Sequence, residues 1–225
     1  MDLQRLSELS DADLDDLYAP PSLPWLRVNM ISTLDGAATG PDGRSGGINN
    51  AADKRVFQTL RRLCDAVVVG AGTARTEAYH DVSKPLVLVG RSGHVPDRLR
   101  DTPAGSVLMA TCEGAEALDE TRALLGADNV LVLGQQRVDL ARLKSVLAER
   151  GFTHLLSEGG PHLLRDLVAE GVADELDWTV VPRLLAGDHP RITAGPPVDV
   201  PLQLALLIEA EGTLLGRWYV GEHAP

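Results

Sequence analysis

Short apolar runs alternate with helical patterns along most of the chain. Several runs are continuous rather than alternating, and most of these end in glycine. Continuous runs of this length are typical of strands that are buried on both faces of a parallel sheet. The pattern predicts strands at 25–31, 65–70, 85–90, 106–111, 129–134, 153–157 and 174–181.

Apolar residues at helical spacing occupy the segments between these runs. Val56, Phe57, Leu60 and Leu63 fall on one face of a helix that Asn50 is able to cap. Further helices are expected near Thr73, from Ala115 to Leu125, after the capping Asp139, and from Pro161 to Gly171, where proline suits the first turn and glycine the end.

The two ends of the chain break the alternation. Residues 204–220 form two apolar segments around Glu211-Gly212, which predicts a hairpin. Residues 1–24 hold a short acidic helix that Ser10 caps, followed by a proline-rich approach to the first strand. We expect residues 1–24 to be an N-terminal extension of one domain at 25–225. The domain is expected to be α/β, with three layers and a mainly parallel sheet that carries a C-terminal antiparallel hairpin.

Composition narrows the list of partners. The 225 residues include 21 basic and 32 acidic side chains, a formal charge of -11. This charge disfavours nucleic acid and anionic membrane surfaces as partners. The chain lacks the pattern of a signal peptide, and its two isolated cysteines suggest a reducing compartment, so a cytoplasmic protein with a small-molecule substrate is expected.

Glycines follow four of the predicted strands. Because the carboxyl ends of parallel strands share one edge of a sheet, these turns are expected to converge on a ligand. A helix that starts at such a turn directs its N–H groups and positive dipole end to the same place, which suits phosphate. Taken singly, each turn is explained as well by chain reversal. Together they predict a phosphate-bearing dinucleotide at Gly70, Gly72, Thr73, Gly90, Arg91, Ser92, Gly134, Gly159 and Gly160.

Charged and polar residues beside these glycines suggest specific roles. Arg91 or Arg75 is a candidate partner for a ribose 2′-phosphate, which would select NADPH over NADH. The first strand ends near the polar residues Asn29, Ser32 and Thr33, which are candidates for substrate binding. Asp35 follows as a possible proton carrier, although an aspartate before glycine also suits a simple turn.

Other chemistries find no support. No GxGxxG opens a βαβ unit, no nucleotide-hydrolysing P-loop occurs, and no GxSxG motif places a nucleophilic serine. The six histidines and two cysteines lack the spacing of a zinc site, so no metal is expected.

Four segments together resemble the pyrimidine reductase family of riboflavin biosynthesis, whose domain is also the C-terminal half of a bifunctional deaminase-reductase. They are STLDGAATG (32–40), LRRLCDAVVVGAGTAR (60–75), LLSEGGPHLLRDLVAEGVADEL (155–176) and VVPRLLAG (180–187). The resemblance implies a dihydrofolate reductase-like fold, a homodimer, and NADPH as cofactor. It also implies reduction of 5-amino-6-(5-phosphoribosylamino)uracil to its ribityl form.

The resemblance implies roles for single residues as well. Asp35 matches the acid beside the substrate, and Glu158 matches a glutamate near the meeting point of substrate and nicotinamide. Gly159, Gly160 and the helix they open, which includes Leu163, are expected to hold the pyrophosphate. The 70–73 and 90–92 turns are expected to hold the adenosine side.

The chain departs from the family pattern where substrate is expected, at Ala37, at Gly47-Ile48 and at 77–80, and also at the strand end Gly90-Arg91. Two other functions therefore stay open. One is reduction of dihydrofolate or another pterin by the same fold. The other is a non-catalytic module that binds NADPH.

Overall fold

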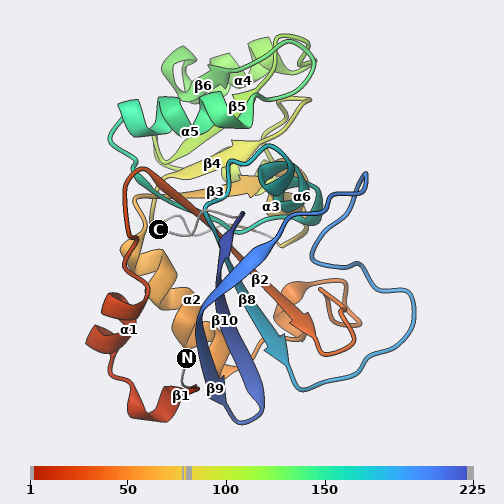
Figure 1. Cartoon of the computed structure of the whole chain (residues 1–225). Helices are drawn as coiled ribbons and strands as arrows, with labels where there is room; N and C mark the ends of the chain where they lie inside the picture. Colours follow the sequence, from red (N-terminus) through yellow and green to blue (C-terminus); the bar gives the residue numbers. More distant parts are fainter. Residues whose placement is uncertain (1–2, 78, 80–82, 222–225) are drawn as a thin grey trace.

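One sheet runs through the structure (Figure 1), a computed structural model that describes residues 3–77, 79 and 83–221. Within that part, ten strands pair in the order β1-β9-β10-β8-β2-β7-β3-β4-β5-β6. Their bounds are β1 Gln4–Arg5, β2 Trp25–Thr33, β3 Ala66–Gly70, β4 Leu86–Val89, β5 Val107–Thr111, β6 Val130–Val132, β7 His154–Ser157, β8 Glu175–Val181, β9 Leu202–Ala210 and β10 Thr213–Val220.

The sheet is mainly parallel. Every pair from β8 through β2 and β7 to β6 is parallel, whereas β10 runs antiparallel to both β8 and β9. Helical crossovers join most of the parallel strands. The predicted class, with an antiparallel hairpin at the C-terminal end, is therefore confirmed, and all seven strand ranges hold to within two residues at each end.

Helices cover both faces of the sheet and enclose two separate cores. α1 (Asp11–Leu17) and α2 (Ala51–Leu63) pack on one face against Val67, Val69 and Leu88, together with the end of α4 (Leu118–Leu125). α5 (Leu140–Glu149) and α6 (Pro161–Ala169) pack on the other against the alternate strand residues, such as Val68 and Val87. Neighbouring strand residues thus enter opposite cores, which explains why the runs are continuously apolar.

Two details differ from the sequence predictions. The helix expected from Ala115 begins at Leu118, because the N–H groups of Ala115 and Ala117 donate to the carbonyls of Cys112 and Ser92 instead of starting the helix. The short strand β1 was not predicted, since two residues carry no detectable pattern; it pairs with β9 in parallel.

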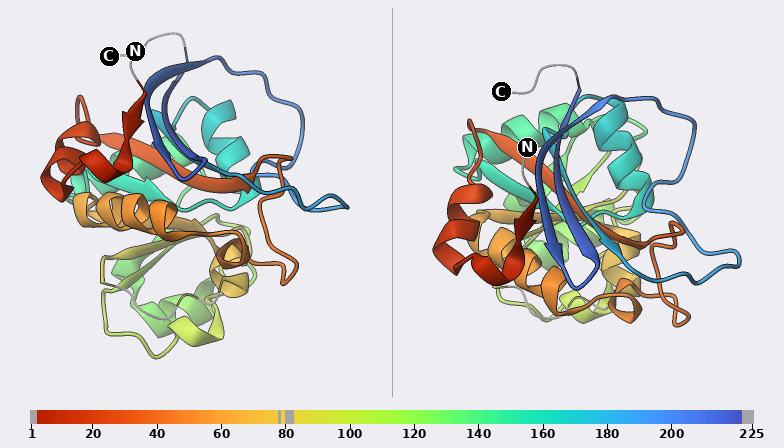
Figure 2. Two further views of the ribbon diagram at one scale, coloured as in Figure 1. Left: turned by 90° about the horizontal axis from the view of Figure 1, so that it is seen from below. Right: turned by 60° about the horizontal axis from the view of Figure 1, so that its bottom comes forward.

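The N-terminal segment packs closely on the rest of the molecule. Figure 2 shows it beside the C-terminal hairpin. Ser10 closes a capping box on α1, as predicted, and Leu14 and Tyr18 are fully buried. The guanidinium of Arg217 donates to the carbonyls of Leu17 and Ala19. The division at residue 24 into extension and domain stays a prediction.

Candidate active site

Three cavities meet at the carboxyl edge of the sheet, around α3 (Ala71–Thr76). The α2 cavity, about 750 Å³, lies between α2, β2 and α3. The α6 cavity, about 280 Å³, lies beside the start of α6, and the β4 cavity, about 480 Å³, lies beyond the end of β4. Gly72 lines all three, so they adjoin one another. The turns at 70–73, 90–92 and 158–160 therefore converge, as the sequence predicted.

The α6 cavity has the features of an anion site. α6 begins after Gly160 with Pro161 in its first turn and no capping side chain, so its first N–H groups have no side-chain acceptor. The Gly70 N–H donates to the Gly159 carbonyl at 2.8 Å, which joins the end of β3 to this turn. A methyl group added at Gly160 would lie 2.2 Å from the Thr73 hydroxyl oxygen, so a side chain there would displace Thr73.

The β4 cavity gathers cationic and hydroxyl side chains. Arg75, Arg91 and Ser92 line it, with Glu116 on the same wall. Gly90 packs against Ala71, whose methyl group would lie 3.0 Å from an added Cβ. This wall brings together the residues that the sequence assigned to the outer end of a dinucleotide.

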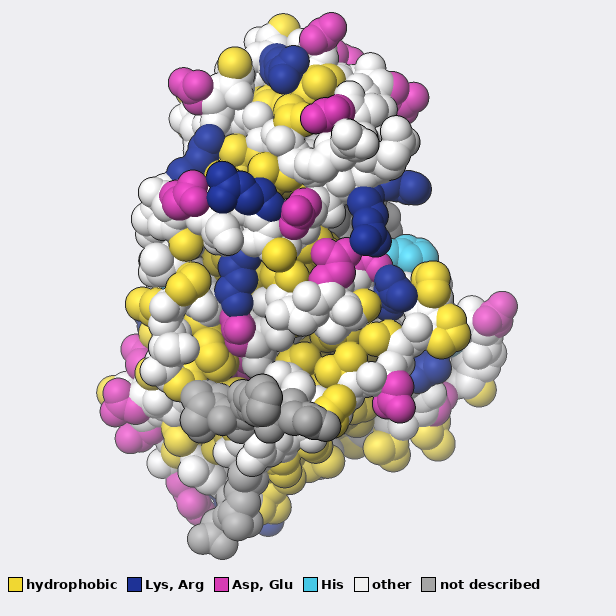
Figure 3. All heavy atoms as spheres, turned by 45° about the horizontal axis from the view of Figure 1, so that its top comes forward, with side chains coloured by type: hydrophobic (Ala, Val, Ile, Leu, Met, Phe, Trp, Pro, Cys, Tyr) yellow, Lys and Arg dark blue, Asp and Glu magenta, His cyan; other side chains and the backbone are white. Residues whose placement is uncertain are grey.

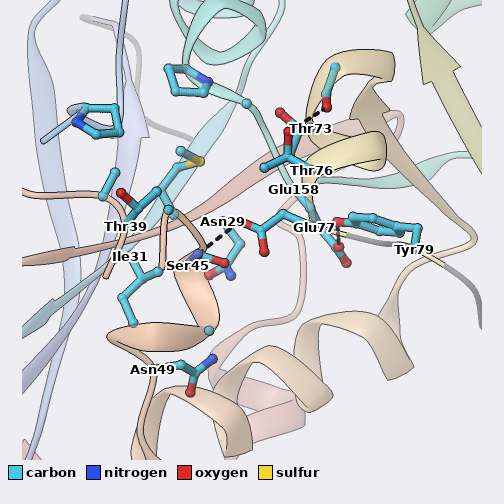
Figure 4. A pocket seen from close by; sticks show the side chains of 18 of the residues that line it. Asn29, Ile31, Thr39, Ser45, Asn49, Thr73, Thr76, Glu77, Tyr79 and Glu158 are labelled. Carbon is cyan, nitrogen blue, oxygen red and sulfur yellow. Dashed lines mark hydrogen bonds between the residues drawn. The ribbon is translucent and has the colours of Figure 1, made fainter. Parts of the chain in front are cut away.

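The α2 cavity is lined by side chains from α2, β2, α3 and the loop before α2. Figure 4 shows Asn49, Ile31 and Ser45 toward one end of it and Thr73, Thr76 and Tyr79 toward the other. Asn29, predicted as a substrate residue, projects between the two groups. The cavity therefore has room for a ring at one end and for a polar chain leading toward α3.

Glu158 is fixed in this cavity by two partners. The Arg61 guanidinium donates to both of its carboxylate oxygens, at 2.7 and 2.8 Å, and the Tyr79 hydroxyl donates to Oε2. Arg61 also lies over the Phe57 ring, 4.5 Å from its centroid. Burial, together with the charge of Glu158, raises the pKa of Tyr79 well above its usual value, so its hydroxyl keeps its proton. Only 6% of the Glu158 side chain is exposed.

Sequence reasoning assigned no site role to the residues of α2, and to Asn49 just before it, that line the cavity. Asn49, Asp53, Phe57 and Arg61 are spaced by four, and all line it. Asp53 is 3% exposed, and burial raises its pKa, although the Thr179 hydroxyl and the Lys54 charge oppose the rise. The signal was present as a spacing of four with three polar members, but only the apolar positions of this helix entered the prediction.

Asp35 lies outside all three cavities. One carboxylate oxygen accepts from the Thr33 hydroxyl, and the other accepts from the N–H groups of Leu185 and Ala186 at 2.9 and 2.8 Å. The Thr33 hydroxyl and these N–H groups hold the pKa of Asp35 below its usual value. The contacts favour an anchor between two loops over a proton carrier, and the catalytic role stays a prediction.

Four other predicted residues line none of the cavities. Ser32 and Thr33 are buried, and Ser32 accepts from the Trp178 indole N–H at 3.0 Å. Gly134 makes a turn in which an added Cβ would lie 2.3 Å from the Arg137 carbonyl oxygen. Gly159 has a φ of +74° and packs on Met30. Leu163 does line the α6 cavity.

The departures from the family pattern have structural counterparts. Gly47 lies against Gly40, and a Cβ at Gly47 would meet the Asp42 carboxylate at 2.6 Å, so this loop has no room for a large side chain. Ala37 is buried and bonds the Thr33 hydroxyl through its N–H. The departures at Ala78 and His80 fall outside the described residues.

The described residues offer neither a metal site nor a membrane-spanning helix. Among the described residues, no group of three or more His, Cys, Asp or Glu side chains is placed to hold a metal ion. No helix of the described ranges is long and apolar enough to cross a bilayer. Figure 3 shows basic and acidic side chains interspersed over one face of the molecule, without a large basic area of the kind that binds nucleic acid.

Known proteins resemble the chain over most of its length. The family model described as RibD C-terminal domain matches residues 24–211. A 2,5-diamino-6-ribosylamino-4(3H)-pyrimidinone 5′-phosphate reductase of Archaeoglobus fulgidus is 27% identical over 192 residues, which cover 76% of this chain and 87% of that protein. The riboflavin biosynthesis protein RibD of Bacillus amyloliquefaciens is 25% identical and matches 82% of this chain, but only 52% of its own length is covered.

Solved structures share the fold. A pyrimidine reductase-like protein from Corynebacterium diphtheriae superposes with a TM-score of 0.80 at 24% identity, over 96% of this chain and all of that one. A diaminohydroxyphosphoribosylaminopyrimidine deaminase/5-amino-6-(5-phosphoribosylamino)uracil reductase from Thermotoga maritima gives a TM-score of 0.65 at 19% identity, over 88% of this chain and 57% of that one.

Proposed function

Since the chain belongs to the RibD C-terminal domain family, we propose that it reduces a phosphoribosylaminopyrimidine of riboflavin biosynthesis to the ribityl form, with NADPH as reductant. The family is one of reductases, and a reductase of this kind needs a nicotinamide cofactor. The observation that carries the proposal is the convergence of the three strand-end turns on adjoining cavities. The homodimer implied by the resemblance remains part of the proposal.

The residues present fit a dinucleotide. Gly160 cannot carry a side chain without displacing Thr73, and the uncapped start of α6 offers N–H donors to a pyrophosphate. Arg91, Ser92 and Arg75 would hold the 2′-phosphate that distinguishes NADPH from NADH. The cavities on either side of Gly72 then separate cofactor, beside α6 and β4, from substrate, beside α2.

The cofactor, when bound, supplies the hydride. The protein's own contribution is to bind, orient and keep water from the reacting groups. Glu158 is held in one position by Arg61 and Tyr79, so it offers a fixed acceptor to the sugar hydroxyls of a substrate that reaches toward α3. Phe57, Met30 and Ile31 give the α2 cavity apolar walls, which suit the faces of a flat ring.

The test is turnover with defined substrates. The purified protein should oxidise NADPH when it is given a phosphoribosylaminopyrimidine and should leave NADPH untouched with dihydrofolate. NADPH oxidation with dihydrofolate alone would replace the proposal with the pterin alternative. Tight NADPH binding without oxidation by any pyrimidine or pterin would identify a non-catalytic module.

Arg91→Ala tests the cofactor assignment separately. It should weaken NADPH binding by about 1–3 kcal/mol, the size of a lost charge-assisted contact, and should leave NADH binding unchanged. Equal losses for both nucleotides would remove Arg91 from the 2′-phosphate site. Arg98→Ala is a matched control, because Arg98 is exposed and lines none of the three cavities.

A further inference from the structure

Two polar groups in the α2 cavity are not used by the reaction described above. Asp53 is 3% exposed and lies on the cavity wall, and the Thr179 hydroxyl donates to its carboxylate. Asn49, four residues earlier, has a carboxamide oxygen that is buried and accepts no hydrogen bond from the described part of the chain. A carboxylate accepts several hydrogen bonds, so Asp53 keeps acceptor sites beside the one that Thr179 fills. The buried Asn49 oxygen costs free energy unless a ligand supplies a donor.

The surroundings of this pair identify the part of the ligand that it meets. Figure 4 shows Asn49 and Ile31 toward one end of the cavity, well away from Tyr79 and Thr76, and Asp53, four residues after Asn49, also lines it. Apolar walls with a few convergent polar groups are typical of a site for a flat heterocycle. The pair therefore faces the edge of the ring, whereas Glu158 faces the chain attached to it.

We infer that Asp53 and Asn49 recognise the substituent at C2 of the pyrimidine ring by hydrogen bonding and favour a 2-amino-4-pyrimidinone over a uracil. The inference deepens the proposed function and rests on it for the identity of the site. A 2-amino-4-pyrimidinone presents adjacent N–H donors, at the ring nitrogen and the exocyclic amine, which match a carboxylate and a carboxamide oxygen. A uracil presents a carbonyl oxygen at the same corner, which would face one of these acceptors.

The environment of Asp53 agrees with this assignment. Desolvation raises the pKa of its carboxyl, although the Thr179 hydroxyl and the Lys54 charge lower it, so further donors from a ligand would favour the charged form. The two N–H donors of the ring would provide them. The protein would then act on the pyrimidine before, and not after, the hydrolytic step that converts its 2-amino group to an oxo group.

The experiment measures binding of two free bases by calorimetry, without cofactor or turnover. The probes are 2,5,6-triamino-4-pyrimidinone and 5,6-diaminouracil, which differ in the C2 substituent and in the proton that the uracil carries at N1. The wild-type protein should bind the triamino base roughly 10- to 100-fold more tightly, the range expected for one charge-assisted hydrogen bond gained against one repulsive contact. Equal binding, or tighter binding of the uracil, would overturn the inference.

Asp53→Asn should invert the preference, because a carboxamide offers one donor to the C2 carbonyl and one acceptor to the ring N–H. An inverted preference cannot arise from misfolding, which would weaken both probes. Asn49→Ala should reduce the wild-type preference several-fold and covers the case in which Asp53→Asn does not fold. Asp119→Asn, the same change on the exposed face of α4, should leave the preference intact.

The readout also separates the two proposals. A C2 preference that depends on Asp53, in a protein that oxidises NADPH with neither ring, would retain the binding assignment and remove the reductase. Turnover of both rings with no C2 preference in binding would retain the reductase and remove the role of Asp53.

Discussion

The most informative residue of the site is Glu158, whose carboxylate is enclosed by partners that the sequence pattern did not assign to it. Arg61 supplies a bidentate contact and Tyr79 a third donor, so every strong contact of Glu158 comes from elsewhere in the chain. A carboxylate held in this way has a fixed orientation, which a substrate hydroxyl requires if it is to be positioned for reduction.

Arg61→Met tests this arrangement. It leaves a nearly buried carboxylate without its main partner, so the free energy of unfolding should fall by roughly 1–3 kcal/mol, and the KM for the pyrimidine should rise. Arg62→Met is the matched control, since Arg62 pairs with Asp15 at the surface and should cost about 0–1 kcal/mol. Urea unfolding and initial rates provide both readouts. Equal costs for the two arginines would contradict the role given to Glu158.

Asp35 requires a test that distinguishes an anchor from a proton carrier. If it anchors the loops, Asp35→Asn should keep most of kcat, while the amides of Leu185 and Ala186 should exchange their hydrogens faster. A proton carrier would instead lose on the order of 100-fold or more in kcat. Kinetics and amide hydrogen exchange on the same variant separate these outcomes.

At the scale of elements, the apolar runs were sufficient to predict the strands and their mainly parallel pairing. A run such as 65–70 is buried on both faces of the sheet, so its continuous apolar pattern is enough to predict a strand of a parallel sheet. The start of α4 was misplaced because the Ala117 N–H donates to the carbonyl of Ser92, in a distant segment, which no local pattern reports. The face of α2 that lines the cavity was missed for a similar reason, since polar spacing alone does not distinguish solvent from a cavity.

Replacement by alanine should have opposite effects on stability at two glycines, one in α3 and one at the start of α6. Gly160→Ala should destabilise the fold, because the new methyl group would lie 2.2 Å from the Thr73 oxygen. Gly72→Ala meets no atom within 4 Å and lies in a helix, so stability should be kept or should rise by about 0.5–1 kcal/mol. Because Gly72 lines all three cavities, that variant should still bind NADPH more weakly. Full NADPH affinity in a stable Gly72→Ala protein would argue against close approach of the cofactor at α3.

At the scale of the whole molecule, a buried polar network joins the N-terminal segment to the sheet. Arg27 is fully buried, donates to the Tyr18 carbonyl and lies 3.4 Å from the Glu175 carboxylate, which also accepts from Arg217. Removing one partner of such a network leaves a buried charge without a counter-charge, which is strongly destabilising. Because the partners come from both the N-terminal segment and the sheet, we expect the two to fold as one cooperative unit.

His154, at the edge of this network, makes stability depend on pH. Burial, and then the nearby Arg27 charge, lowers its pKa to about 4, whereas an unfolded histidine titrates near 6.5. The unfolded chain therefore takes up the proton first, and the contribution to stability is lost as the pH falls from about 6.5 toward 4. His154→Gln should lose less stability than the wild type between pH 7 and pH 5, by about 1–2 kcal/mol.

The comparison with His154→Gln is needed because other groups titrate with the opposite sign. Burial beside Glu175 raises the pKa of Asp177 well above its usual value, so its protonation favours the folded state as the pH falls. The difference between the two proteins isolates His154. Urea midpoints that shift equally with pH in both would contradict its assignment.

The central claim is that the adjoining cavities around Gly72 hold a nicotinamide cofactor and a ribosylaminopyrimidine together. Its most direct measurement is NADPH consumption by the purified protein with the phosphorylated substrate, with the product identified by mass spectrometry. The account predicts one ribityl product for each NADPH oxidised. NADPH that binds tightly but is never oxidised, whichever ring the substrate carries, would contradict it.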